Sequence, residues 1–373
     1  MMFLRVINAA PAPPLVFLVA LSLVTPMSSQ AQDSRPKPSC AECKLVFDSL
    51  TTLGATDGDG ALRAGPSSIV EDAEGRFVVG QMVDNEPARV FAPDGSFVST
   101  IGAIGDGPGE YRKVGALSAT GETLHVYDEG TQRISTVDLD LKLQGTIPLR
   151  GFAVMDAVAL SSGLHIVNMI VPGGASGGHA LHLVNEEGEI IRSIEPFDSR
   201  DGDPFAHFRH VFRAEGGEGF WSVPYFGRIV VRLYSSDGDL LKEWSAAPAL
   251  GDELPMSYGN PDEDRPPTRQ ILAPWHDDGM LWVFSMIPGP RWRDGLTRAE
   301  DGVHGTYFKT TDRDLLFDPA IEVFDADTGT LVAARYAKDL PISTPVGPGV
   351  GASMSTDELG WVFLTIRRAR LVR

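Results

Sequence analysis

The chain has 373 residues, of which 40 are glycine and 27 are proline, with 43% apolar and 22% charged. This composition is typical of a folded, turn-rich protein and excludes collagen-like and intrinsically disordered chains. Lysine and arginine number 32 against 50 aspartate and glutamate, so the formal net charge is -18. Because a nucleic acid needs a basic surface, we expect no nucleic-acid partner.

Residues 1–31 are predicted to form a secretory signal peptide. Arg5 supplies a positive charge, residues 15–24 are an apolar run of ten, and Ser29-Gln30-Ala31 offers small residues for cleavage. Ten apolar residues are too few to span a bilayer, although an uncleaved anchor that starts at Pro11 is the alternative. We expect a periplasmic or secreted protein that has no transmembrane span after cleavage.

Cys40 and Cys43 are the only cysteines, and they lie in a segment, residues 32–44, that precedes the first predicted strand. In an exported protein a single pair of cysteines is expected to form a disulfide. A redox dithiol is an alternative for the CxxC spacing, but no βαβ pattern surrounds it. A zinc site would need two further ligands. We therefore predict a structural disulfide.

From residue 45 to the C-terminus the sequence repeats a turn followed by two β-rich runs. In the first run, one position always holds a flat ring and the next is mostly β-branched, as expected for the two faces of a pleated strand. The second run usually ends in a polar turn, such as Pro93-Asp94-Gly95. Four antiparallel strands, A to D, in a unit of about 45 residues are typical of a propeller blade. The ring position of strand B is held by Phe77, His125, His165, Trp221, Trp282 and Trp361.

The two ends of the repeat predict how the blades close into a ring. The sixth B strand is expected at residues 359–363 and the sixth C strand at 369–372, with no D strand after it. Such an open edge would promote aggregation. Residues 49–54 are similar to the first D strand and its following glycine, residues 97–102, so they are predicted to supply the missing strand. The predicted fold is all-β, a six-bladed β-propeller over residues 45–373 closed by its N-terminal strand. Two β-sandwich domains are the alternative.

One glycine-rich segment connects the first two predicted blades: Ile101-Gly102-Ala103-Ile104-Gly105-Asp106-Gly107-Pro108-Gly109-Glu110-Tyr111. With this loop, the repeat resembles the six-bladed propellers of exported bacterial proteins, akin to the NHL and TolB-like groups. The resemblance covers residues 45–373 and implies the fold. It implies no reaction, because the same fold hosts binding modules, hydrolases and lyases.

Connection lengths predict the working face of the ring. B-to-C and D-to-A connections share one face, and long loops on one rim of a rigid scaffold usually carry ligand contacts. Nearly all long segments fall on that face: 102–114, 171–178, 197–208, 246–270 and 287–317. At the entrances of the A strands, the candidate ligand contacts are Tyr111, Arg112, Asp156, His210 and Arg269. The longest loop adds Arg291, Trp292, Arg293 and His304.

Guanidinium pairing and ring stacking could hold an anionic or sugar-like group on this face, although loop arginines often pair with nearby carboxylates such as Asp294. We expect a monomeric binding protein for a small molecule, glycan or protein rather than an enzyme. The first alternative is a metal-dependent lactonase or esterase, which needs acidic and amide ligands near the axis, where Asp156 and Asn168 are available. The second is a polysaccharide lyase. We predict no catalytic residue, cofactor or metal ligand, with calcium as the metal alternative.

Overall fold

The computed structural model describes residues 35–173, 177–197, 205, 207–217, 219–247, 257–301 and 305–373. The predicted signal peptide lies outside these residues, and so does His304. Residues 34–373 form one compact unit. Within the described ranges, no helix is long and apolar enough to cross a membrane.

The described part of this unit contains six four-stranded antiparallel sheets and two small two-stranded sheets. In each four-stranded sheet the strands follow the order A, B, C, D, so each of these sheets is one blade. Blade 1 contains β2 (Pro66–Glu71), β3 (Phe77–Gln81), β4 (Ala88–Phe91) and β5 (Phe97–Ile101). Blade 2 contains β8 (Val114–Thr120), β9 (Thr123–Asp128), β10 (Arg133–Val137) and β11 (Leu143–Pro148). Blade 3 contains β12 (Phe152–Ala159), β13 (His165–Ile170), β14 (His179–Val184) and β15 (Ile190–Pro196). Blade 4 contains β16 (Arg209–Arg213), β17 (Gly219–Pro224), β18 (Val230–Ser235) and β19 (Leu240–Ser245). Blade 5 contains β20 (Gln270–Asp277), β21 (Met280–Pro288), β24 (Phe317–Asp325) and β25 (Leu331–Tyr336). Blade 6 contains β26 (Thr344–Gly347), β27 (Val350–Thr356), β28 (Val362–Val372) and β1 (Lys44–Leu53).

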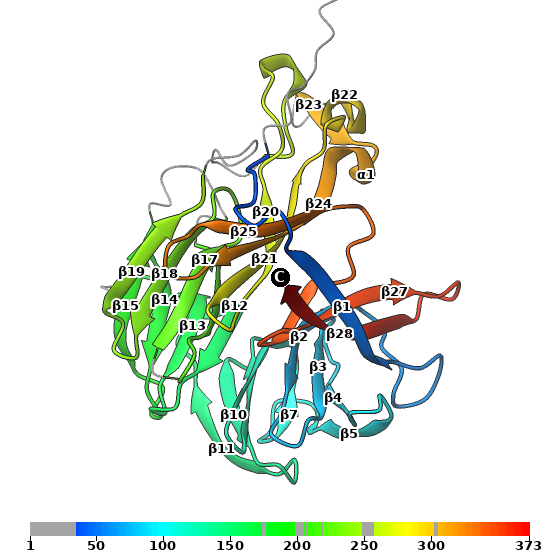
Figure 1. Ribbon diagram of the computed structural model, residues 1–373. Coiled ribbons are helices and arrows are strands. Elements are labelled where there is room, and N and C mark those ends of the chain that lie inside the picture. The colour runs from blue at the N-terminus through cyan, green and yellow to red at the C-terminus, as the bar shows by residue number, and fades with distance from the viewer. Residues whose placement is uncertain are drawn as a thin grey trace, which may run out of the picture. The chain divides into compact units, whose positions relative to one another are not determined.

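The A strands close a circle, because each of β2, β8, β12, β16, β20 and β26 contacts the A strand of the next blade and β26 contacts β2 (Figure 1). A cluster of buried apolar side chains lies at each junction between adjacent blades. Phe77 of blade 1 shares one cluster with Val350 of blade 6, and Trp221 of blade 4 shares another with Leu281 of blade 5. The fold is therefore a six-bladed β-propeller, as predicted.

The N-terminal strand completes the last blade. β1 runs antiparallel to β28 from the pair Lys44 and Val372 to the pair Leu53 and Leu364, and the two strands lie side by side in Figure 1. This pairing confirms the predicted closure. The register differs from the expected one, since residues 49–53 lie beside 364–367 and residues 44–47 lie beside 369–372.

The predicted sixth B strand is wrong. The B strand of blade 6 is β27, and Trp361 lies just before β28, which is the C strand. Residues 357–361 form the B-to-C turn, in which Asp357 Oδ1 accepts hydrogen bonds from the backbone N–H groups of Leu359 and Trp361. A B-to-C turn followed by strand C has the same turn-then-strand pattern as an A-to-B turn followed by strand B, so the pattern alone gave the wrong strand.

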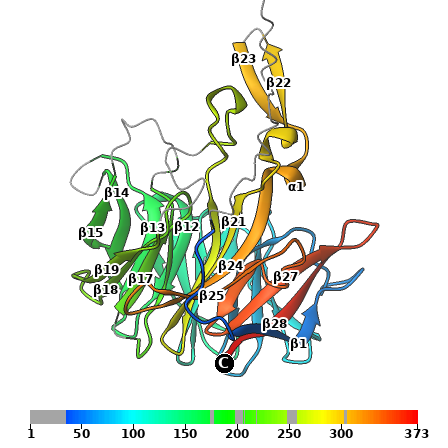
Figure 2. The ribbon, with the colours of Figure 1, turned by 45° about the horizontal axis from the view of Figure 1, so that its top comes forward.

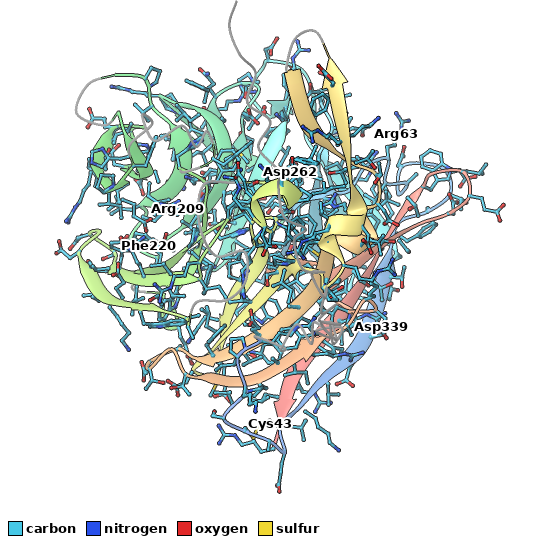
Figure 3. The ribbon with its side chains drawn as sticks, turned by 90° about the horizontal axis from the view of Figure 1, so that it is seen from above. Cys43, Arg63, Arg209, Phe220, Asp262 and Asp339 are labelled. Carbon is cyan, nitrogen blue, oxygen red and sulfur yellow. A yellow bond between two sulfur atoms is a disulfide. The ribbon has the colours of Figure 1, made fainter. Side chains whose placement is uncertain are left out.

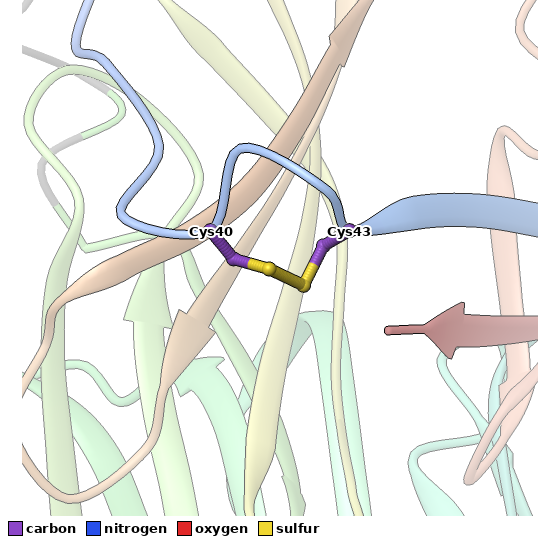
Figure 4. The surroundings of a disulfide bond; sticks show 2 residues. All are labelled: Cys40 and Cys43. Atoms are coloured by element: carbon purple, nitrogen blue, oxygen red, sulfur yellow. A yellow bond between two sulfur atoms is a disulfide. The ribbon is translucent and has the colours of Figure 1, made fainter.

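Residues 35–43, which we call the strap, precede β1 and follow the outer edge of blade 5. The backbone N–H groups of Ser39 and Cys40 donate to the carbonyl oxygens of Leu331 and Val332 at 2.9 and 3.1 Å. Cys40 and Cys43 form the predicted disulfide (Figure 4). The strap therefore extends the β25 edge before the chain crosses to blade 6 as β1.

Candidate binding face

The strand boundaries place all five long segments between B and C strands or between D and A strands, on one face of the ring. We call it the loop-bearing face. The longest described insertion stands on it between β21 and β24, and Figure 2 shows its hairpin rising above the strands of the blades. It contains η3 (Trp292–Gly295), β22 (Leu296–Asp301), β23 (Gly305–Thr310) and α1 (Arg313–Leu316).

This insertion, residues 289–316, has its own small core. Trp292, Leu296, Leu316 and Phe317 pack together, and Trp292 is 2% exposed. At Gly295 an added Cβ would lie 2.6 Å from the carbonyl oxygen of Asp312, so η3 can approach the start of α1 only with glycine there. The hairpin is therefore held firmly at its base.

A second loop, residues 257–268, packs against this insertion. An added Cβ at Gly259 would lie 3.1 Å from Cζ3 of Trp292. Arg298 pairs with Asp262 at 3.6 Å, and Arg293 pairs with Asp264; Asp262 is labelled in Figure 3. The two loops thus form one cross-linked projection, which we call the arm (residues 257–268, 289–301 and 305–316).

The candidate contacts on the arm are already engaged with one another and with acidic neighbours. Trp292 is buried at the base, and the guanidinium of Arg293 lies 4.5 Å from the centroid of its ring. Arg291 is exposed and pairs with Asp294 at 2.9 Å. The structure therefore brings Trp292 and Arg293 together, but as part of the scaffold of the arm.

Tyr111 and Arg112 belong to the glycine-rich loop, in which β6 (Ala103–Ile104) pairs with β7 (Glu110–Tyr111). Tyr111 is 1% exposed, and burial raises the pKa of its hydroxyl. Its ring lies against Gly102, where an added Cβ would lie 2.5 Å from Cε2. Arg112 is half-exposed and binds both carboxylate oxygens of Asp106 at 3.0 and 2.9 Å, which lowers the pKa of Asp106. The loop is thus closed by its own arginine.

Asp156 and His210 lie on adjacent A strands. The Nε2 atom of His210 donates to the carbonyl oxygen of Ile271 at 2.8 Å, and its ring stacks on Tyr225 with centroids 3.7 Å apart. Its Nδ1 atom is 3.6 Å from Oδ2 of Asp156, which also accepts from the N–H of Val211. Burial, and then the charge of Asp156, raise the pKa of Tyr225. His210 is 5% exposed, so this cluster ties blades 3, 4 and 5 together.

Arg269 is 3% exposed and pairs with Glu322, which is 1% exposed, at 2.6 Å between Nη1 and Oε2. The hydroxyl of Tyr336 donates to the other carboxylate oxygen of Glu322 at 3.2 Å. Burial, and then the charge of Glu322, raise the pKa of Tyr336. This ion pair borders a cavity of about 380 Å³, whose other lining residues include Lys37. Neither Glu322 nor Lys37 was predicted from the sequence, because the residues that line the cavity come from segments far apart in the chain.

A comparable buried carboxylate joins blades 3 and 4. Glu195 accepts from Arg209 at 2.6 Å, from Arg232 at 3.2 Å and from the hydroxyl of Tyr234 at 3.2 Å. Burial alone would raise the pKa of Glu195, but the two guanidinium groups and hydrogen bonds outweigh it and the pKa is lowered. In the parts of the chain that the structure describes, no group of three or more His, Cys, Asp or Glu side chains is arranged to hold a metal ion.

Comparisons with known proteins support the six-bladed propeller fold. Residues 63–169 match the family model DUF5128, described as a 6-bladed beta-propeller. A Bacteroides fragilis protein described as exported is 12% identical over 90% of this chain and 98% of its own, with a TM-score of 0.56. A member of the duf4221 family from Bacteroides vulgatus is 11% identical over 89% of this chain and 99% of its own, with a TM-score of 0.53. A search of the curated proteins finds no match. At these identities the solved structures support the six-bladed fold alone.

Proposed function

We propose that this protein is an exported binding protein, periplasmic or secreted, and that its loop-bearing face recognises a partner polypeptide through the arm. The observation that carries this proposal is the arm itself, in which the second loop lies against Trp292 of the small core at Gly259 and is joined to the insertion by two ion pairs. A projection ordered before binding loses little conformational freedom when a partner docks, and this favours affinity.

Export is supported by three observations of different kinds. The sequence begins with a predicted signal peptide, the Cys40–Cys43 pair is oxidised, and a protein of similar fold is described as exported. Disulfides form and persist in oxidising compartments such as the periplasm.

Exposed aromatic side chains on the arm favour a polypeptide over a small molecule. Tyr258 is 52% exposed and Tyr307 is 38% exposed. Tyrosine is enriched in protein interfaces and in the few residues that dominate their binding energy. A rigid projection that carries tyrosines is suited to docking against the surface of another chain.

The proposal is tested by panning a random-peptide phage library on the immobilised chain that lacks residues 1–31. We expect the selected peptides to bind at least tenfold more weakly to Tyr258→Ala than to the unmodified protein. Leu240→Ser is the matched control, because Leu240 is 53% exposed but lies at the start of β19, on the face with the short C-to-D turns. Peptides that bind Tyr258→Ala as well as the unmodified protein would refute the role of the arm.

A further inference from the structure

We propose that the cavity between blades 4 and 5, beneath the strap, is a separate binding site for a small organic carboxylate with an apolar body. None of the described residues that line it belongs to the arm, so the proposal can be tested independently of the polypeptide-binding face.

Three segments that are distant in the sequence wall this cavity. The strap contributes Pro36, Lys37 and Ser39, the end of blade 4 contributes Ala247, and blade 5 contributes Leu331 among others. The cavity has a volume of about 380 Å³, within the range of about 300–1,000 Å³ that is usual for small-molecule sites. Its apolar lining on two blades suits a compact hydrocarbon or aromatic body.

The charges around the cavity favour an anion. Lys37 and Arg269 are cationic and Glu322 is anionic, so these three lining groups sum to +1, in a chain whose formal net charge is -18. Both carboxylate oxygens of Glu322 already accept hydrogen bonds, one from Arg269 and one from Tyr336. Lys37 lines the cavity and is exposed, and among the described residues it has no ion pair. A ligand carboxylate would therefore meet Lys37 first.

The strap is fixed in place on both sides of Lys37. On one side, Arg35 pairs with Asp318 at 3.1 Å, and its guanidinium lies 4.8 Å from the centroid of the Tyr336 ring. On the other side, Ser39 is hydrogen-bonded to Leu331. The disulfide then closes the turn that leads into β1 (Figure 4). These contacts hold the segment around Lys37 beside the cavity, so little ordering of the strap is needed for binding.

The site is tested by isothermal titration calorimetry of the chain that lacks residues 1–31. The probes are hexanoate and benzoate, with hexanamide, benzamide and hexylamine as analogues of nearly the same size but different charge. We expect at least one carboxylate to bind saturably at millimolar concentration or below, and its amide to bind at least tenfold more weakly. No saturable binding of either carboxylate, or equal binding of acid and amide, would overturn the proposal.

Two variants place the binding in the cavity. Lys37→Met removes the charge from an exposed side chain and should weaken carboxylate binding at least tenfold, while the control Lys309→Met on β23 should leave it unchanged. Ala247→Trp should abolish binding by filling the cavity, and since Ala247 is exposed the change should leave the melting temperature nearly unchanged. Binding that survives both Lys37→Met and Ala247→Trp would overturn the assignment of this site, whatever the outcome at the arm.

Discussion

The closure of the ring predicts that Leu53 stabilises the whole propeller although it lies near the N-terminus. Leu53 is 0% exposed, pairs across the strands with Leu364, and belongs to the cluster between blades 6 and 1. Leu53→Ala removes three carbons, or about 2.4 kcal/mol of transfer free energy at about 0.8 kcal/mol each. The cavity left behind raises the expected loss in the free energy of unfolding to about 3–5 kcal/mol.

The assay is equilibrium urea unfolding, followed by tryptophan fluorescence and by far-ultraviolet circular dichroism. Leu50→Ala is the control, because Leu50 lies on the same strand but is 46% exposed, and it should cost under about 0.5 kcal/mol. If β1 closes the ring, the two probes should shift together in Leu53→Ala. A loss under about 1 kcal/mol, or equal losses in the two variants, would refute the closure.

Trp221→Ala should lower the free energy of unfolding by about 3–5 kcal/mol in the same urea assay, because Trp221 is 4% exposed between blades 4 and 5. Burial lowers the pKa of His165 to about 3 and that of His182 to about 4. Below about pH 6.5, the usual pKa of histidine, the unfolded chain takes up protons at these two side chains while the folded state keeps them neutral. The free energy of unfolding should therefore be highest above about pH 6.5, as far as these two histidines are concerned. Below that it should fall by about 1.4 kcal/mol per pH unit for each histidine, as measured by urea titrations at pH 7, 6 and 5. Cys40→Ser with Cys43→Ser should cost about 2 kcal/mol or less, because the cysteines are 3 residues apart and close a very short loop; reduction of the unmodified protein should give the same loss. Arg112→Ala should change the melting temperature little, since its bond to Asp106 is exposed on both sides.

The repeat in the sequence predicted the blades, the closure and the loop-bearing face, because turn chemistry and strand alternation are local properties of the chain. The error in blade 6 has the same origin. Trp361 follows a turn in the way that Trp221 and Trp282 do, but its turn connects B to C rather than A to B. Local pattern identifies a turn and a strand, and only counting strands from a fixed end identifies which strand it is.

Burial of the candidate residues could not be predicted in the same way. His210 and Arg269 both lie at or near the start of an A strand, and they are only 5% and 3% exposed. Arg269 is matched by Glu322, which is 53 residues away on strand C of its own blade. Nothing near Arg269 in the sequence shows whether it faces a ligand or a distant carboxylate.

Buried ion pairs of this kind account for two of the arginines at the loop-bearing ends of the A strands. The pair of Arg209 and Glu195 joins the entrance of an A strand to strand D of the preceding blade. The pair of Arg269 and Glu322 joins the entrance of an A strand to strand C of the same blade. Breaking such a pair by removing one partner leaves a buried charge uncompensated, at a cost of about 3–5 kcal/mol. Arg269→Ala would therefore destabilise the region that borders the cavity and could not separate ligand binding from stability. Lys37, on the exposed strap, is the residue at which binding and stability can be separated.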